Sequence, residues 1–416
     1  MDLPIACVNI DSYINMSKRF LTAPQAAQRL GISIPSLYAY VSRGRLRSEA
    51  GPGPSRSRRY LVEDVDRLRA RKEGRRDPGR VAREALNWGA PVLDSAITRI
   101  EGGELFYRGR NVRDLARTHT VEEVASLIWR GTFDVLDLAS ATRPPLDLSA
   151  RKQIRAITRT LHPVEQFEIL LSLSGARDPA AFDLKTKAVI RTGLHILLLL
   201  TETACGQPAG DGLARALARA WAPRIPDAEG LISACLILCA DHELNISAFT
   251  ARCVASAAST PYSVVAAGLH ALTGFRHGGE SLRVEAFLNR AGNAREARAL
   301  VTAAARTGER VAGFGHPLYP DGDPRAKHLL EELSHRRKAL DPAGESMAQA
   351  MLDLYEERPT IDFALAMVSR TLRLPQGSPL TLFALGRCIG FIGHAIEQYE
   401  SGVLIRPRAR YTGPVG

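Results

Sequence analysis

The sequence predicts a mainly α-helical protein of more than one domain, on three observations. With 416 residues, the chain is long enough for two or three domains of about 150 residues each. It is 45% hydrophobic, which is ample for buried cores. Apolar residues recur at helical spacing along most of the chain, whereas the alternating patterns of strands are few.

The first elements expected are two short helices joined by a tight turn. Residues 22–33 combine helical apolar spacing with a turn at Gly31. Ser33 is placed to cap a second helix over about residues 34–43, and Pro35 fits the first turn of that helix. The side chains that this second helix is expected to expose are Ser36, Tyr40 and Arg43.

A basic hairpin and a third helix are expected to complete the amino-terminal domain. The hairpin is predicted at residues 56–60, which include Arg58 and Arg59, and the helix at about residues 62–72. The whole segment over residues 20–73 resembles the winged helix-turn-helix of the MerR and excisionase type. In such modules the second helix enters the major groove of DNA and the wing contacts phosphates.

The distribution of charge supports a polyanionic partner for this domain. Residues 1–80 hold 16 Lys and Arg against 8 Asp and Glu, a net charge of +8, whereas the remainder holds 39 against 36, a net charge of +3. The resemblance implies duplex DNA as the partner, contacted by Ser36, Tyr40, Arg43, Arg58 and Arg59. The alternative is a basic appendage that packs on the rest of the protein or mediates assembly.

A linker is predicted at residues 74–87, and the chain beyond it is expected to be helical. Residues 120–129 and 213–221 have clear helical spacing, while residues 97–107 predict a short β-hairpin. Gly313 and Gly315 are not part of a dinucleotide-binding motif, because the third glycine and the βαβ setting are missing.

The loop from Gly313 to Arg325, called the histidine loop below, predicts a binding site for a small acid. It reads Gly-Phe-Gly-His-Pro-Leu-Tyr-Pro-Asp-Gly-Asp-Pro-Arg, and its glycines allow close approach to a ligand while its prolines stiffen the backbone. His316 suits a carbonyl oxygen as donor or general acid, and Arg325 suits a carboxylate. Taken alone, the loop is equally compatible with a surface turn.

Further segments in a fixed order resemble the citrate synthase family. The resemblance covers about residues 88–414. Its motifs are Glu104-Leu-Phe-Tyr-Arg-Gly109, Asp241-His-Glu-Leu-Asn-Ile-Ser247, Leu272-Thr-Gly-Phe-Arg-His-Gly-Gly279, the histidine loop, Thr360-Ile-Asp-Phe363, Gly386-Arg387 and the tail around Arg406. It implies a large and a small helical domain within residues 88–416, the small one being an insertion at about residues 274–372.

The resemblance implies condensation of an acyl-CoA with oxaloacetate, giving citrate or 2-methylcitrate and free CoA without a cofactor. The residues matching the catalytic groups are His277, His316 and Asp362, and those matching the oxo-acid binders are His242, Arg325, Arg387 and Arg406. Asp362 matches the base, His277 the enolate stabiliser and His316 the carbonyl polariser. In this family Arg406 reaches the site of a partner subunit, which implies a homodimer with shared sites. Individually, these residues are also compatible with a helix cap, surface charges and a core histidine.

The chain departs from the family pattern beside two of these histidines. Glu280-Ser281 stands where Ala-Asn is usual, and Arg276 where a small or apolar residue is usual. Pro317 and Pro320 replace residues that are often basic or apolar. The alternative function, which the basic amino-terminal module favours, is a DNA-binding regulator that uses a citrate synthase-like domain as a metabolite sensor. Retention of His277, His316 and Asp362 favours the enzyme, since a sensor needs no base.

The remaining sequence signals favour a cytoplasmic protein without a structural metal. No basic start followed by an apolar stretch marks a signal peptide, and the longest apolar run, residues 234–240, is far short of a bilayer span. The six cysteines contain no Cys-x-x-Cys pair. Cys235, Cys239 and His242 share a helical face, but their apolar neighbours favour a helix core over a metal site.

Overall fold

The computed structural model divides the chain into two compact units, Met1–Asp94 and Ser95–Gly416. The residues it describes are 20–42, 46–50, 58–62, 64–65, 68, 93–134, 136, 138, 153–154, 156–336, 340–409 and 411–414. The linker predicted at residues 74–87 lies outside this set. This division into two units does not test the boundaries predicted for the small domain, about residues 274–372, which stay a prediction.

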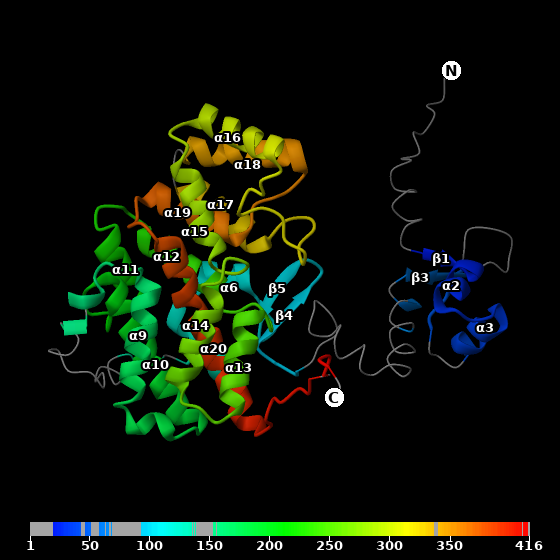
Figure 1. The fold of residues 1–416 in the computed structure, drawn as a ribbon, viewed down its shortest axis with the longest axis horizontal. Helices are drawn as coiled ribbons and strands as arrows, with labels where there is room; N and C mark the ends of the chain where they lie inside the picture. The colour runs from blue at the N-terminus through cyan, green and yellow to red at the C-terminus, as the bar shows by residue number, and fades with distance from the viewer. Residues whose placement is uncertain are drawn as a thin grey trace, which may run out of the picture. The chain divides into compact units, whose positions relative to one another are not determined.

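Among its described residues, the amino-terminal unit has a small three-stranded antiparallel sheet and the helices α2 and α3 (Figure 1). In chain order the elements are β1 Phe20–Thr22, α2 Ala23–Leu30, α3 Ile34–Ser42, β2 Glu49–Ala50 and β3 Arg58–Leu61. The central strand is β3. Leu37, Tyr60 and Val65 are fully buried and form the core with residues of α2. The predicted pair of helices is thus confirmed, whereas β1 was not anticipated.

Local signals explain the ends of these two helices. The Thr22 hydroxyl accepts a hydrogen bond from the backbone of Gln25, and the Gln25 side chain accepts one from the backbone N–H of Thr22, which forms a capping box. Gly31 ends α2 in the left-handed conformation, at φ 59°. The predicted cap at Ser33 is present, since its Oγ accepts from the Ser36 N–H at 3.3 Å.

The carboxy-terminal unit opens with a β-meander and is otherwise built from helices. The strands are β4 Thr98–Glu101, β5 Glu104–Tyr107 and β6 Arg110–Asn111, paired antiparallel in this order. Gly102 and Gly103, both with positive φ, form the two-residue turn between β4 and β5. The hairpin predicted over residues 97–107 is therefore confirmed.

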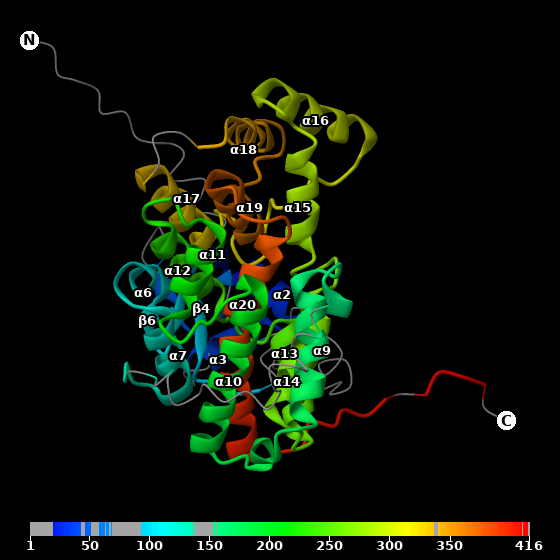
Figure 2. The same cartoon turned by 90° about the vertical axis from the view of Figure 1, so that its left-hand side faces the viewer.

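The helices that follow include both of those predicted from spacing. They are α6 Val112–Thr118, α7 Val121–Arg130, α9 Pro163–Gly175, η1 Pro179–Phe182, α10 Thr186–Cys205, α11 Leu213–Trp221, α12 Ala228–Cys239, α13 Ile246–Ser256, α14 Pro261–Leu272, α15 Glu280–Asn289, α16 Ala294–Thr307, α17 Pro324–Arg336, α18 Pro342–Tyr355, α19 Ile361–Leu372 and α20 Ser378–Ser401. Figures 1 and 2 show α15 to α19 gathered at one end of this unit.

Helix α20 runs through the middle of the unit and contacts α10, α12, α13, α14 and α19. Its backbone comes very close to α12, because an added Cβ at Gly386 or Gly390 would meet the carbonyl oxygens of Leu236 or Ala240. The Gly390 N–H also donates to the Ala240 oxygen at 3.0 Å. These glycines fix the distance between two helices that flank the candidate site.

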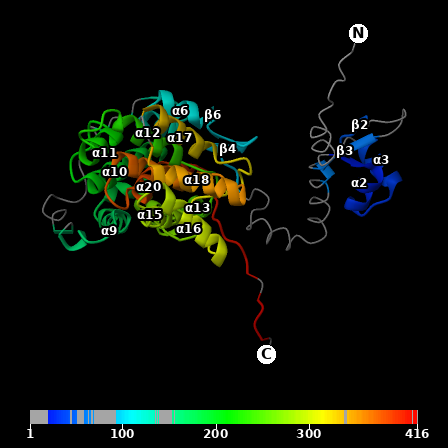
Figure 3. The same ribbon diagram turned by 90° about the horizontal axis from the view of Figure 1, so that it is seen from above.

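Two helices, α10 and α20, are long and apolar enough to cross a membrane if length and composition alone are considered. All of the apolar window of α20 and 67% of that of α10 are buried inside the unit. Burial of this kind is typical of the core helices of a large domain. The described residues after α20 have no regular secondary structure, and Figures 2 and 3 show this part of the chain running away from the helices.

Candidate active site

The turn between α12 and α13 carries His242 and is held by buried polar contacts. The Asp241 carboxylate accepts from Thr98 Oγ1 at 2.5 Å and contacts His394 Nε2 at 3.1 Å. Both Asp241 and His394 are fully buried. Glu243 adopts a positive φ of 51°, which reverses the chain directly after His242. The position of His242 is therefore set by contacts from β4 and α20.

The histidine loop lies between α16 and α17 and packs against the start of α19. Gly313 and Gly315 have φ values of 89° and 70°, as the glycine-rich sequence predicted. Backbone hydrogen bonds join Gly315 to Arg358 and Thr360 to Gly313, at 3.0 and 2.9 Å. Consequently this loop and the start of α19 are fixed together.

His242 and His316 come together through a tyrosine of the same loop. Their ring centroids are 5.5 Å apart, and the Tyr319 hydroxyl contacts His242 Nε2 at 2.8 Å. Burial and the charge of Arg325 lower the pKa of His316 to about 4. Since His316 Nδ1 accepts from the Leu318 N–H at 3.2 Å, the neutral ring carries its proton on Nε2. His316 is thus a neutral donor at pH 7.

His277 lies in the turn between α14 and α15 and contacts Ser247 of α13. The distance between His277 Nε2 and Ser247 Oγ is 2.7 Å. Burial, together with the charges of Arg387 and Arg325, lowers the pKa of His277 to about 3, so this ring is also neutral at pH 7. The Ser247 hydroxyl also donates to Asn245 Oδ1 at 2.7 Å, so with its single proton used there it accepts from His277 Nε2–H.

Asp362 lies in the first turn of α19 but is not its cap residue, which is Thr360. Its half-buried carboxylate accepts from the Ser281 hydroxyl at 2.5 Å. Burial raises the pKa of Asp362 to about 6, and the charge of Glu280 adds to the rise, while the hydrogen bond from Ser281 opposes it. A carboxylate with a pKa near neutrality is suited to general-base catalysis.

Arg325 is buried and paired with an aspartate that sequence reasoning did not single out. Asp323 accepts from Arg325 Nε at 2.9 Å and from Nη2 at 2.8 Å, and it also accepts from the Ile361 N–H at 3.0 Å. Burial opposes ionisation of Asp323, but the charge and hydrogen bonds of Arg325 outweigh it and hold its pKa below the ordinary value. The edge of the Arg325 guanidinium formed by Nε and Nη2 is therefore already occupied by Asp323.

Arg387 has an unused donor in the protein interior. It is 1% exposed on α20, and its Nε donates to the Cys239 carbonyl oxygen at 2.9 Å. Its Nη1 is buried without a hydrogen-bond partner in the part of the chain that the structure describes. A buried guanidinium nitrogen left unsatisfied is costly, so an anion at this position would compensate it.

The structure thus brings together six of the seven predicted residues, which are His242, His277, His316, Arg325, Asp362 and Arg387. The seventh, Arg406, is exposed in the tail after α20 and does not join them within its own chain. Ser247, Tyr319 and Asp323 were missed, although all three lie inside the motifs quoted above. Their contacts link residues 30 to 77 positions apart, or a loop to a helix start, and no local pattern reveals such pairs.

The candidate DNA-binding residues of the amino-terminal unit differ in exposure. Ser36 is exposed, while Tyr40 is half-buried against the core and therefore only partly exposed, and its contact with DNA stays a prediction. Leu37 points into the core, which turns Tyr38 outward, and Tyr38 is 51% exposed. Arg43 lies outside the described residues.

The two wing arginines also differ. Arg58 is exposed and donates to Ser48 Oγ at 2.6 Å. Arg59 lies 4.2 Å from the ring centroid of Phe20 and 3.3 Å from the Glu49 carboxylate, which holds it against the sheet. Arg58 is therefore the freer of the two to meet a phosphate.

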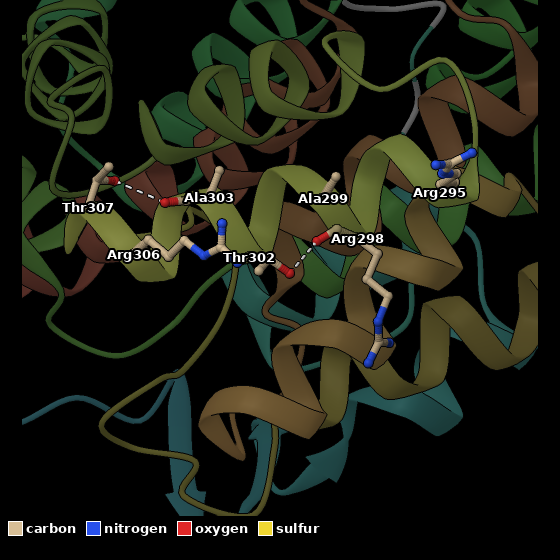
Figure 4. A pocket seen from close by; sticks show the side chains of 7 residues that line it. All are labelled: Arg295, Arg298, Ala299, Thr302, Ala303, Arg306 and Thr307. Carbon is tan, nitrogen blue, oxygen red and sulfur yellow. Dashed lines mark hydrogen bonds between the residues drawn. The ribbon is translucent and has the colours of Figure 1, made fainter.

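A separate hollow of about 550 Å³ lies on α16 (Figure 4). Its lining comes from one helix and consists of Arg295, Arg298, Ala299, Thr302, Ala303, Arg306 and Thr307. It includes none of the residues of the candidate site. Cys235 and Cys239 are buried, and no group of three or more His, Cys, Asp or Glu among the described residues is arranged to hold a metal ion.

Comparison with known proteins identifies both units. Residues 85–408 match the family model "Citrate synthase, C-terminal domain", and residues 20–73 match "Helix-turn-helix domain". The chain belongs to the citrate synthase family. It is 30% identical to citrate synthase 2 of Bacillus subtilis over 357 residues, which covers 78% of this chain and 95% of that protein.

Other relatives and solved structures agree. The chain is 27% identical to 2-methylcitrate synthase 2 of Corynebacterium glutamicum, over 77% of this chain and 92% of that protein. The crystal structure of citrate synthase from Thermotoga maritima superposes with a TM-score of 0.68 at 25% identity, covering 79% of this chain and 95% of that one. The predicted mainly α fold and the helix-turn-helix module are confirmed, and the carboxy-terminal unit is a citrate synthase-like enzyme.

Proposed function

We propose that the carboxy-terminal unit condenses acetyl-CoA or propionyl-CoA with oxaloacetate, giving citrate or 2-methylcitrate and free CoA. The observation that carries this proposal is the position of Asp362, a half-buried carboxylate with a pKa of about 6, in one site with two neutral histidines. The family includes relatives named for either product, so the acyl donor is left to experiment.

Asp362 is proposed to remove a proton from the carbon next to the thioester. Negative charge then develops on the thioester oxygen, and His277 is placed to stabilise it by donating a hydrogen bond. For this, Ser247 must redirect its one proton from Asn245 Oδ1 to His277 Nε2, so that the neutral ring carries its own proton on Nδ1. Burial of the ring favours the neutral form throughout.

The enolate carbon is proposed to attack the ketone of oxaloacetate, with the His316 Nε2–H polarising the ketone oxygen. The unpaired Nη1 of Arg387 and the open edge of Arg325 would hold the carboxylates, and His242, oriented by Tyr319, would donate a further hydrogen bond. Carbon–carbon bond formation leaves a CoA thioester of the product. Water then hydrolyses this thioester and releases the CoA thiol.

We further propose a cytoplasmic homodimer in which Arg406 completes the site of the partner subunit. Within its own chain Arg406 is exposed on a tail that leaves the helices, so a role at the oxo acid requires a second copy. A fork-shaped, always charged side chain on such a tail suits a carboxylate.

The amino-terminal unit supports a second proposal, that the enzyme binds duplex DNA. The match to a helix-turn-helix family and the net charge of +8 in residues 1–80 favour it. In this proposal, exposed Ser36 and Tyr38 on α3 would face a groove of the DNA, and exposed Arg58 on β3 would meet a phosphate. DNA binding would regulate or localise the enzyme.

A thiol-release assay tests the main proposal. Purified full-length protein is mixed with oxaloacetate and either acetyl-CoA or propionyl-CoA, and free CoA is measured. Thiol release that needs both substrates, with citrate or 2-methylcitrate identified by mass spectrometry, supports the proposal. Absence of product with both donors, from protein that is folded by circular dichroism, would leave the metabolite-sensor alternative.

A further inference from the structure

Glu280-Ser281, the dipeptide at which the chain departs from its family, forms the first turn of α15 directly after the His277 turn. Both side chains reach toward the other catalytic segments. The Ser281 hydroxyl donates to Asp362 Oδ1 at 2.5 Å, and Glu280 Oε1 accepts from the Gly313 N–H at 3.2 Å. One helical turn therefore contacts the segments that carry all three catalytic residues.

We propose that Ser281 is a positioning residue, whose hydroxyl fixes the Asp362 carboxylate so that one oxygen is held by the protein and the other faces the substrate. This inference rests on the proposed function, because it assigns Asp362 as the base. Ser281 itself is fully buried, and its role in the reaction would be exerted through Asp362.

The geometry supports a fixed orientation of the base. Asp362 projects from the first turn of α19, where rotation about its side-chain bonds would otherwise leave the carboxylate several orientations. Ser281 Oγ, on a different helix, binds Oδ1 only. No other hydrogen bond to this carboxylate occurs among the described residues, so Oδ2 stays available for a proton. A donor that is fixed and buried removes that freedom before the substrate arrives.

Glu280 adds a second contact between α15 and the catalytic segments, and its negative charge raises the pKa of Asp362. Its carboxylate binds Gly313 of the histidine loop and is 2.9 Å from Arg283 and 3.9 Å from Arg310. The ionisable groups that act on Asp362 from the surrounding elements are Glu280 on α15, Cys239 on α12, and Asp323 and Arg325 at the start of α17. Of the contacts to Asp362, the Ser281 hydrogen bond is the one that a single-atom deletion removes.

The proposal predicts a specific signature for Ser281→Ala. Thiol-release kcat should fall about tenfold, while KM for oxaloacetate should change less than twofold, because oxo-acid groups are untouched. The hydrogen bond favours the ionised base, so its loss should move the acidic limb of the kcat profile to higher pH. The kcat and the acidic limb of Ser281→Cys, whose side chain is of similar size but a weaker donor, should lie between those of wild type and Ser281→Ala. Ser174→Ala, which removes a fully buried hydroxyl of α9 without a hydrogen-bond partner among the described residues, should change none of these values.

A second measurement separates this inference from the proposed function. The melting temperature of Ser281→Ala should fall further below wild type at pH 8 than at pH 5, since a hydrogen bond to an ionised carboxylate is stronger than one to a neutral acid. If the wild type is inactive but the melting difference between wild type and Ser281→Ala depends on pH in this way, the proposed condensation is rejected. The hydrogen bond from Ser281 to ionised Asp362 is then still supported. Active wild type with an unmoved acidic limb and a pH-independent melting difference in Ser281→Ala would overturn the inference.

Discussion

Replacing Asp362 by Asn should stabilise the fold at neutral pH while it abolishes the proposed chemistry. Asn keeps an oxygen that accepts the hydrogen bond from Ser281, but it carries no charge and cannot act as a base. Condensation should fall by about 100-fold or more. The ionised carboxylate of the wild type is the destabilised form, because burial raises its pKa from 3.8 to about 6.

The size and sign of the stability change follow from proton linkage. The shift in pKa corresponds to at most about 3 kcal/mol, at about 1.4 kcal/mol per pKa unit, and solvent around the half-buried side chain reduces it. Since the folded-state pKa lies above the unfolded value, the native protein binds more protons between about pH 4 and pH 6. Wild-type stability from this group is therefore present below pH 4 and lost as the pH rises through 6.

Melting curves of wild type and Asp362→Asn at several pH values test this reasoning. The variant should melt up to about 4 °C higher at pH 7.5, and the difference should shrink below pH 5 and nearly vanish at pH 4. Ser174→Ala serves as a control without a titrating group. A variant that melts at or below the wild-type temperature at pH 7.5 would refute the argument that ionised Asp362 is held against a burial cost.

Three further outcomes are expected. Asp323→Asn leaves a buried guanidinium without its ion pair, so the melting temperature should fall by several degrees and KM for oxaloacetate should rise, as measured by unfolding and thiol release. Arg58→Ala with Arg59→Ala should weaken binding of all duplex sequences and reduce its salt dependence in a fluorescence titration, whereas undetectable wild-type binding at low salt would leave an assembly role. Mixed dimers of Asp362→Asn with Arg406→Ala should regain about half of the wild-type dimer activity after subunit exchange; a mixture as inactive as its parents would exclude a shared site.

Local patterns predicted the elements well where the local signal and the packing agree. Residues 213–221 form a helix with the predicted bounds, because their apolar stripe meets α10 and α12. Phe20–Thr22 was missed as a strand, since three residues carry no period and their pairing with β3 is long-range. Tyr40 is less exposed than predicted, because the spacing of α3 alone does not say which of its faces packs on the core.

The same distinction holds for the candidate site. His316 and Arg325 could be found in the sequence because glycine and proline mark their loop, and their neighbours matched a family order. Tyr319 was overlooked because its partner, His242, lies in another motif. Asp323 was overlooked because its burial and its joint contacts with Arg325 and the Ile361 N–H depend on the fold. A motif names residues, whereas pairing between motifs depends on the fold.

Because α12 and α20 approach each other closely, two glycines without a chemical role, Gly386 and Gly390, are as important for function as the reacting groups. Gly386 and Gly390 touch no substrate group, yet a methyl at either would meet the backbone of α12. The displaced segments would be those that carry Arg387 and lead into His242, so the first symptom of the change would be lost oxo-acid recognition. In this protein a steric change in the core would thus be measurable as weaker oxo-acid binding as well as lower stability.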